Sequence, residues 1–293
     1  MASSRTGRGS ATGTPPRGPR RPLPPAPKPQ PLPHVRRVVV VGSGKGGVGK
    51  STVSTNLAVA LATTTQPPLR VGLLDADVYG PSLPRLMHLS GAPQLVERSD
   101  GPPLIRPLQN HGVHCMSMGF LLGEKAPLAW RGLMVMKALE QLTRHVAWDV
   151  DVLIVDLPPG TGDVPLSLAQ TVVVDGAVIV STPQDVALAD AYKGLSMFEK
   201  MGVPVLGLIQ NMSHYTCTHC GHHAHLFGHD GVRRWAERAN TPLLGSVPLT
   251  EAVMQSGEDG TPIVIAAPQS DAAQQYRQMA GELARKLGLD SKA

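Results

Sequence analysis

Residues 38–52 read Val38-Val39-Val40-Val41-Gly42-Ser43-Gly44-Lys45-Gly46-Gly47-Val48-Gly49-Lys50-Ser51-Thr52, and this stretch decides the fold. Four valines form a run typical of a buried strand, and glycines dominate the loop that follows. Apolar residues then recur at helical spacing. Gly44 and the run Gly49-Lys50-Ser51 satisfy the pattern G-x-x-x-x-G-K-[ST] in this strand–loop–helix setting. The stretch therefore predicts a phosphate-binding loop in an α/β domain.

The residue types in this loop suit the phosphates of a nucleotide. Glycines allow successive backbone N–H groups to converge on phosphate oxygens, and the helix N-terminus adds the positive end of its dipole. We expect Lys50 to reach the β- and γ-phosphates and Ser51 to bind Mg²⁺, with Lys50 facing the ligand rather than the core. The expected contacts come from Gly44, Lys45, Gly46, Gly47, Val48, Gly49, Lys50, Ser51 and Thr52. A glycine-rich turn without a ligand is the weaker alternative.

From residue 35 onward, apolar runs of strand length alternate with amphipathic stretches of helix length. We expect strands at 37–41, 71–75, 113–118, 152–156, 177–181, 205–209 and 243–247. We expect helices at 50–63, 133–146, 185–201, 231–239 and 271–287. Several strand runs are apolar on both faces, which is typical of a parallel sheet covered by helices on both sides. The prediction is a single doubly wound α/β domain with a mostly parallel sheet over residues 35–293.

Charge is unevenly distributed along the 293-residue chain. It carries 27 Lys+Arg and 22 Asp+Glu, yet residues 1–74 contain no acidic residue. The remainder is acidic on balance, so we do not expect the folded body to bind nucleic acid. Three cysteines are too few for a disulfide framework, and no apolar run approaches the length that crosses a bilayer. A disulfide-stapled secreted domain is therefore excluded, and membrane association is not required.

Residues 1–34 contain 10 prolines, together with Gly, Ser, Thr and Arg. Such a segment buries too little apolar surface to offset chain entropy, so it is predicted to be disordered. Its arginines, without any acid, fit a mitochondrial transit peptide, whereas its prolines do not, because an import peptide forms an amphipathic helix. A transit peptide and a solvated basic tail both remain open.

Two predicted strands end in aspartate, at the sheet edge where α/β proteins bind ligands. Asp75 closes the run at 71–75, with Asp77 two residues later, and Asp156 closes another run. A hydrolysing NTPase needs carboxylates near Mg²⁺ and the attacking water. We expect Asp156 in the outer sphere of the metal, Asp77 positioning the water and the metal, and Asp75 in support. Asp75 and Asp163 can equally be helix caps.

The stretch Cys217-Thr218-His219-Cys220 lies in the histidine-rich segment 212–228, for which we predict neither helix nor strand. Two thiolates on one tight turn suit zinc or an iron–sulfur cluster, but one pair cannot complete a four-ligand site. Either His225 and His229 finish a zinc site within the chain, or a second chain supplies another pair. Reduced surface thiols are the simpler alternative. Cys115, in a predicted buried strand, is expected to belong to the core.

Lys45 assigns the phosphate loop to a narrower class of P-loops. A second lysine directly after the first motif glycine gives the "deviant" Walker A form, and here the loop resembles that of the MinD/ParA-like P-loop ATPases. The resemblance implies that Lys45 crosses a dimer interface and couples ATP binding to dimerisation. It also implies that Asn211 reads the adenine ring. No N-K-x-D sequence follows Asn211, which favours ATP over GTP.

A combination of motifs is more specific than any single one. It comprises the deviant Walker A loop, Asp75-Ala76-Asp77-Val78-Tyr79-Gly80-Pro81-Ser82, Trp130-Arg131-Gly132-Leu133-Met134-Val135-Met136, Asp156-Leu157-Pro158-Pro159-Gly160-Thr161-Gly162-Asp163, and the pair Cys217 and Cys220. Together these motifs resemble the Mrp-type iron–sulfur carrier ATPases across residues 35–285. The resemblance is strongest to the mitochondrial branch of that family, whose members assemble respiratory complex I.

The family resemblance implies a function and its components. It implies a homodimer in which Cys217 and Cys220 of two subunits hold a labile [4Fe–4S] cluster, with ATP and Mg²⁺ as cofactors. ATP turnover, expected to be slow and carried by Lys45, Lys50, Asp77 and Asp156, would serve delivery of the cluster to apo iron–sulfur proteins. Complex I subunits in the mitochondrial matrix are the implied recipients. A zinc-stabilised ATP-binding interaction module and a MinD/ParA-like positioning ATPase are the alternatives, and the latter gives the two cysteines no role.

Overall fold

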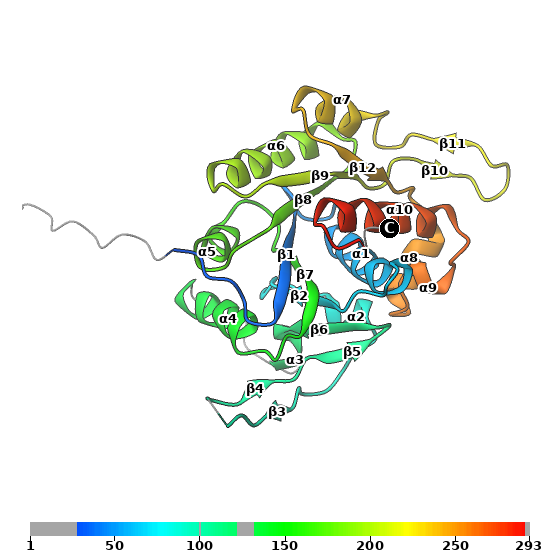
Figure 1. Cartoon of the computed structure of the whole chain (residues 1–293). Helices are drawn as coiled ribbons and strands as arrows, with labels where there is room; N and C mark the ends of the chain where they lie inside the picture. Colours follow the sequence, from blue (N-terminus) through cyan, green and yellow to red (C-terminus); the bar gives the residue numbers. More distant parts are fainter. Residues whose placement is uncertain (1–27, 100, 122–131, 291–293) are drawn as a thin grey trace, which may run out of the picture.

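The computed structural model describes residues 28–99, 101–121 and 132–290. An eight-stranded sheet forms its centre, with the strand order β12-β9-β8-β1-β7-β2-β6-β5 (Figure 1). In chain order the strands are β1 (Val35–Gly42), β2 (Val71–Asp75), β5 (Leu108–Asn110), β6 (Val113–Ser117), β7 (Val150–Asp156), β8 (Gly176–Ser181), β9 (Val205–Gln210) and β12 (Leu243–Ser246). β5 pairs antiparallel with β6, and the other neighbours are parallel. The predicted mostly parallel sheet is confirmed.

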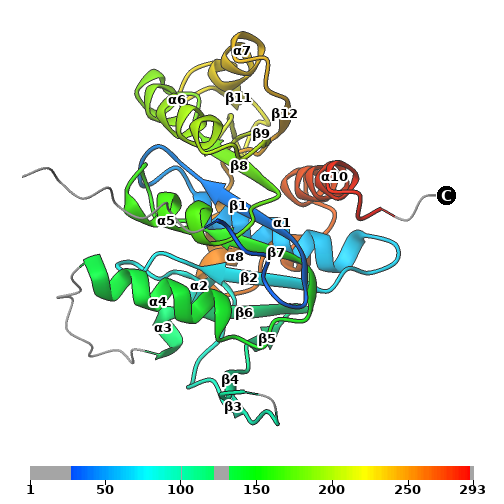
Figure 2. The same ribbon diagram turned by 60° about the vertical axis from the view of Figure 1, so that its left-hand side comes forward.

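Helices cover both faces of this sheet, as two views show (Figures 1 and 2). One face carries α1 (Lys50–Thr64) and α10 (Asp271–Lys286), with α8 (Glu251–Glu258) and α9 (Ile263–Ala266) beside them. The other face carries α4 (Gly132–Arg144), α5 (Asp163–Thr171), α6 (Asp185–Lys200) and α7 (Gly231–Arg238). Two short helices, α2 (Leu83–Leu86) and α3 (Met118–Leu121), lie in the connections. The doubly wound arrangement is the predicted one.

The core consists of strands that are buried on both faces. All five residues of β2 and all six of β8 are buried. Cys115 in β6 has no exposed surface, and its burial raises the pKa of its thiol. The prediction that Cys115 belongs to the core is confirmed. Within the described residues, no helix is long and apolar enough to cross a membrane.

Two small hairpins extend from the body. β3 (Leu95–Val96) pairs with β4 (Leu104–Ile105), and β10 (Tyr215–Thr216) pairs with β11 (His223–Ala224), both antiparallel. The second hairpin lies in the segment 212–228, so the prediction that this segment contains no strand is wrong. Its strands are two residues long, too short for an alternating pattern to be visible in the sequence.

The folded body begins before residue 35. The Gln30 backbone N–H donates to the Thr171 carbonyl at 3.0 Å, and the Val173 N–H donates to the Gln30 carbonyl at 3.1 Å. Leu32 is only 4% exposed and belongs to the main core. The predicted boundary of the disordered leader at residue 34 is therefore too far along the chain, because Gln30 and Leu32 already belong to the folded body. A short segment that pairs only through its backbone carries no apolar pattern that a sequence could reveal.

Some predictions fall outside the described residues. The predicted leader up to residue 27 lies outside them, as do Trp130 and Arg131 of one quoted motif.

Candidate nucleotide site and cysteine hairpin

The strand register brings the predicted acidic residues to the phosphate loop. β7 lies between β1 and β2, and Asp156 pairs with Val41 on one side and with Asp75 on the other. Parallel strands that end together place their following loops at one edge of the sheet. The loop after β1 therefore begins beside two carboxylates, as the sequence predicted.

The geometry of the loop fits an anion. Gly49 has φ +79°, and it precedes α1 without a side-chain cap or an acidic residue in the first turn. The first N–H groups of a helix lack partners within it, so here they are open to a phosphate. A Cβ at Gly49 would lie 2.2 Å from the Asn211 amide nitrogen, and one at Gly44 would lie 2.1 Å from the Asp190 carbonyl carbon of α6. Only glycine therefore fits at these two positions, because any side chain would clash with Asn211 or with the backbone of α6.

Lys50 makes a buried ion pair. Its Nζ lies 2.8 Å from Asp156 Oδ1, and the two side chains are 7% and 5% exposed. Ser51 Oγ donates to Asp156 Oδ2 at 2.6 Å, and Ser54 Oγ donates to Oδ1 at 2.6 Å. The expectation that Lys50 faces only the ligand is wrong, because the residue also neutralises a carboxylate in the interior. The sequence analysis missed Ser54, although it lies one helical turn after Lys50 and so on the same face of α1.

Asp75 holds the connection after β2 in place. Its Oδ1 accepts the Asp77 N–H at 3.0 Å. Its Oδ2 accepts the Ser82 N–H at 3.0 Å, the Leu83 N–H at 3.1 Å and the Ser117 hydroxyl at 3.2 Å. This set of donors agrees with the supporting role expected for Asp75 and with the capping alternative, because Leu83 is the first residue of α2.

Burial, and next the charge of Asp156, raise the pKa of Asp75 from 3.8 to about 7.

The other two predicted aspartates, Asp77 and Asp163, are less buried than Asp75. Asp77 Oδ1 accepts the Gly80 N–H at 3.2 Å, and Asp77 lines a separate cavity of about 480 Å³. Asp163 is the first residue of α5, where a carboxylate complements the helix dipole. The capping alternative for Asp163 is therefore wrong, because Gly162 occupies the N-cap position and Asp163 follows it inside the first turn. Hydrolytic contact by Asp77 stays a prediction.

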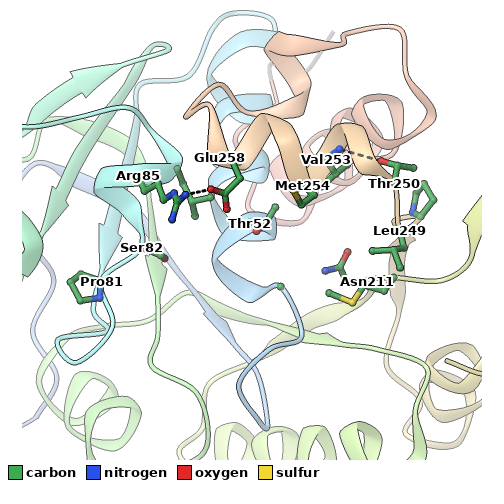
Figure 3. Close-up of a pocket in the computed structure, with 15 residues that line it drawn as sticks. Thr52, Pro81, Ser82, Arg85, Asn211, Leu249, Thr250, Val253, Met254 and Glu258 are labelled. Atoms are coloured by element: carbon green, nitrogen blue, oxygen red, sulfur yellow. Dashed lines mark hydrogen bonds and ion pairs between the residues drawn. The ribbon is translucent and has the colours of Figure 1, made fainter. Parts of the chain in front are cut away.

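A pocket of about 520 Å³ adjoins the start of α1 (Figure 3). Thr52 lies at its middle, Asn211 at one end, and the ion pair of Arg85 with Glu258 spans the other. Asn211 is 6% exposed, and its Nδ2 donates to the Val48 carbonyl at 2.8 Å. Its amide therefore fastens the phosphate loop as well as lining the pocket. The pocket has the position and size for the nucleoside of a bound nucleotide.

The two cysteines lie on the turn between β10 and β11. The Gly221 N–H donates to the Cys217 carbonyl, and the Cys217 N–H donates to the His222 carbonyl, both at 2.9 Å. Cys220 is exposed and Cys217 is half-buried. Hydrogen bonds from the backbone N–H groups of Cys220 and His219, and then from the Cys220 thiol, lower the pKa of Cys217. The turn therefore presents a thiol that ionises readily, next to a second one.

Histidine rings from the same segment contact one another, one pair stacked and one pair tilted. The ring centroids of His214 and His223 are 4.5 Å apart, and those of His225 and His229 are 4.3 Å apart. Burial, followed by the neighbouring imidazoles, lowers the pKa of His214. Among the described residues, no three His, Cys, Asp or Glu side chains are arranged to hold a metal ion. The predicted alternative, a zinc site completed by His225 and His229, is therefore not present in the described part.

The fold and the site together define a P-loop NTPase with a deviant Walker A loop. A family model described as "ParA: NUBPL iron-transfer P-loop NTPase" matches residues 34–284. The chain belongs to this family.

Several known proteins resemble the chain over most of its length. It is 54% identical to the mouse "Iron-sulfur cluster transfer protein NUBPL" over 89% of this chain and 81% of that protein. It is 48% identical to the Arabidopsis thaliana "Iron-sulfur protein required for NADH dehydrogenase, mitochondrial" over 87% and 80% of the two chains. The solved nucleotide-binding protein from Archaeoglobus fulgidus, in complex with ADP, superposes with a TM-score of 0.67 at 33% identity, covering 82% of this chain and 92% of that one.

Proposed function

We propose that this chain carries iron–sulfur clusters and delivers them to apo-proteins, including subunits of respiratory complex I. Family membership supports this, as do the names of relatives that transfer clusters or are required for NADH dehydrogenase. A MinD/ParA-like positioning ATPase would use the same nucleotide site but leaves the cysteine turn without a task. The cluster is the cargo of this activity.

One observation carries the proposal: Cys217 and Cys220 lie together on the turn between β10 and β11, and in the described part of the chain no third His, Cys, Asp or Glu side chain is arranged with them to hold a metal ion. A cluster with four thiolate ligands then needs a second turn from another copy. We infer a homodimer that holds one [4Fe–4S] cluster between two hairpins. Exposure of the turn suits a carrier, because the cargo must leave.

The nucleotide site would work through Lys50, Ser51 and Asp156. ATP would draw Lys50 Nζ towards its phosphates, and the Ser51 hydroxyl would then be free to turn from Asp156 to Mg²⁺. Magnesium, when bound, neutralises phosphate charge. In this proposal Lys45 contacts the nucleotide of the partner subunit and Asn211 contacts the base. Asp77 orients water during slow hydrolysis.

We further propose that the protein acts in the mitochondrial matrix. The Arabidopsis relative is named as mitochondrial, and the arginines before residue 28 occur without any acid. Those residues would form the transit peptide.

Anaerobic reconstitution tests the carrier function. Wild type should take up iron and sulfide at one [4Fe–4S] per dimer, and Cys217→Ser and Cys220→Ser should lose both the cluster and its absorption near roughly 400 nm. Cys115→Ala is the matched control, because it removes a buried thiol away from the turn. Cluster retention in the Cys217 variant, a cluster on monomers, or stoichiometric zinc without sulfide would refute the proposal.

A further inference from the structure

A groove between α6 and α7 remains outside the nucleotide site and the cysteine turn. Its volume is about 240 Å³. α6 contributes Leu188 and Tyr192, and α7 contributes Arg234, Trp235 and Arg238. The two helices lie side by side next to β9, and α7 follows the β10–β11 hairpin along the chain (Figure 1). The groove and the two thiols therefore belong to consecutive elements of the chain.

The groove carries two arginines that make no ion pair with a carboxylate of the described residues. Arg234 and Arg238 are four residues apart, so they share one face of α7. Arg234 Nη1 donates to the His229 carbonyl at 2.6 Å, and among the described residues neither arginine is paired with a carboxylate. Arg233 on the same helix has Asp230 as its partner, with 3.8 Å between Nε and Oδ1.

This charge contrasts with the rest of the body. Residues 75–293 contain 16 Lys+Arg and 22 Asp+Glu. One carboxylate, that of Asp185, also lines the groove, which leaves it one net positive charge. Two unpaired arginines on an acidic body are placed to meet an external anion rather than to balance the chain's own charge.

The groove also offers apolar surface. Tyr192 is 56% exposed, and Trp235 is half-buried against the core. Arginine, tyrosine and tryptophan are the residue types that most often carry binding energy at protein interfaces. A ligand for this surface therefore combines negative charge with apolar side chains.

We propose that this groove docks a short acidic segment of the recipient protein, with aspartate or glutamate side chains on Arg234 and Arg238 and an apolar side chain against Tyr192. The inference rests on the proposed carrier function. Arg234 also connects the groove to the segment that leads from the cysteine turn to α7, because its Nη1 donates to the His229 carbonyl. The acidic body disfavours a nucleic acid, whose backbone is charged throughout.

Fluorescence anisotropy on the full chain tests the docking. The probe is a fluorescein-labelled peptide of alternating glutamate and leucine, compared with its lysine counterpart and with a single-stranded DNA oligonucleotide. Only the glutamate peptide should bind, and added salt should weaken that binding. Arg234→Glu combined with Arg238→Glu should lower its affinity about tenfold or more, because two charge-assisted contacts become repulsive. Arg233→Glu is the matched control and should retain wild-type affinity.

Three results would overturn the inference: no binding of the glutamate peptide to wild type, equal affinities in the double variant and the control, or preference for the oligonucleotide. Cluster measurements on the same proteins separate this inference from the proposed function. The double variant should bind its cluster and release it to a small chelator as wild type does, yet transfer it more slowly to an acidic apo-acceptor. Failure of the carrier proposal would show instead as a cluster retained in Cys217→Ser.

Discussion

Replacing Lys50 by alanine should weaken both nucleotide binding and the fold itself. The lysine and Asp156 are paired at 2.8 Å with almost no exposed surface. Removal of one partner of a buried ion pair costs about 3–5 kcal/mol, because the other charge stays buried. Ser51 and Ser54 still donate to Asp156, so we expect a loss near the lower limit, about 3 kcal/mol. The lost phosphate contact should weaken ATP binding at least about tenfold.

A double-mutant cycle separates the two effects. Urea unfolding would be measured for wild type, Lys50→Ala, Asp156→Asn and the double variant, without nucleotide. Because the asparagine side chain carries no charge, the double variant should be at least about 1 kcal/mol more stable than the sum of the single losses predicts. ATP affinity, measured by calorimetry, should stay low in the double variant. Additive stability losses would refute the buried pair, and unchanged ATP affinity in Lys50→Ala would refute the phosphate assignment.

Three further predictions concern the acidic centre, the amino-terminal arm and the cysteine turn. The raised pKa of Asp75 means that the folded state binds the Asp75 proton more tightly than the unfolded state does. The stabilisation from this proton is therefore full below about pH 4 and is lost as the pH rises to about 7. In urea unfolding at a series of pH values, the stability difference between wild type and Asp75→Asn should fall over that range and stay level above it. Leu32→Ala should lower the free energy of unfolding by about 2–3 kcal/mol, whereas Leu95→Ala, at a position 63% exposed, should change it little. In a Cys220→Ser background, iodoacetamide should alkylate Cys217 at lower pH than it does a cysteine in an unstructured peptide, since two backbone N–H groups still stabilise the thiolate; an identical pH profile would contradict the turn geometry.

The sequence predicted the sheet, its main helices and the phosphate loop because these features have strong local signals. The valines of β1, the glycines after it and the apolar face of α1 are contiguous, so one stretch specifies strand, loop and helix. The aspartates at strand ends were found for the same reason. Their proximity follows from a register that places Asp156 between Val41 and Asp75.

Features that depend on distant partners were missed. The arm at Gln30 is ordered by backbone bonds to residues far along the chain, and no residue type marks such pairing. The ion pair of Lys50 joins the helix after β1 to the end of β7, so its burial depends on topology rather than on spacing. The helix α8 was also missed, although the sequence does mark its start: Thr250 is a capping residue, and its side chain accepts the Val253 N–H at 3.2 Å.

The position of Asn211 has a mechanical consequence. Its side chain holds the phosphate loop at Val48, and Cys217 follows only six residues later, a span of at most about 21 Å of extended chain. Between them, Met212 has φ +55°, a conformation that is strained for a side chain of its kind. The stretch is also anchored midway, because the Ser213 N–H donates to the Val247 carbonyl at 3.0 Å and the Leu249 N–H donates to the His214 carbonyl at 2.8 Å. Under the proposed carrier function, the nucleotide pocket and the cluster-binding turn would therefore be joined by a covalent path of only six residues, held against the sheet at its middle.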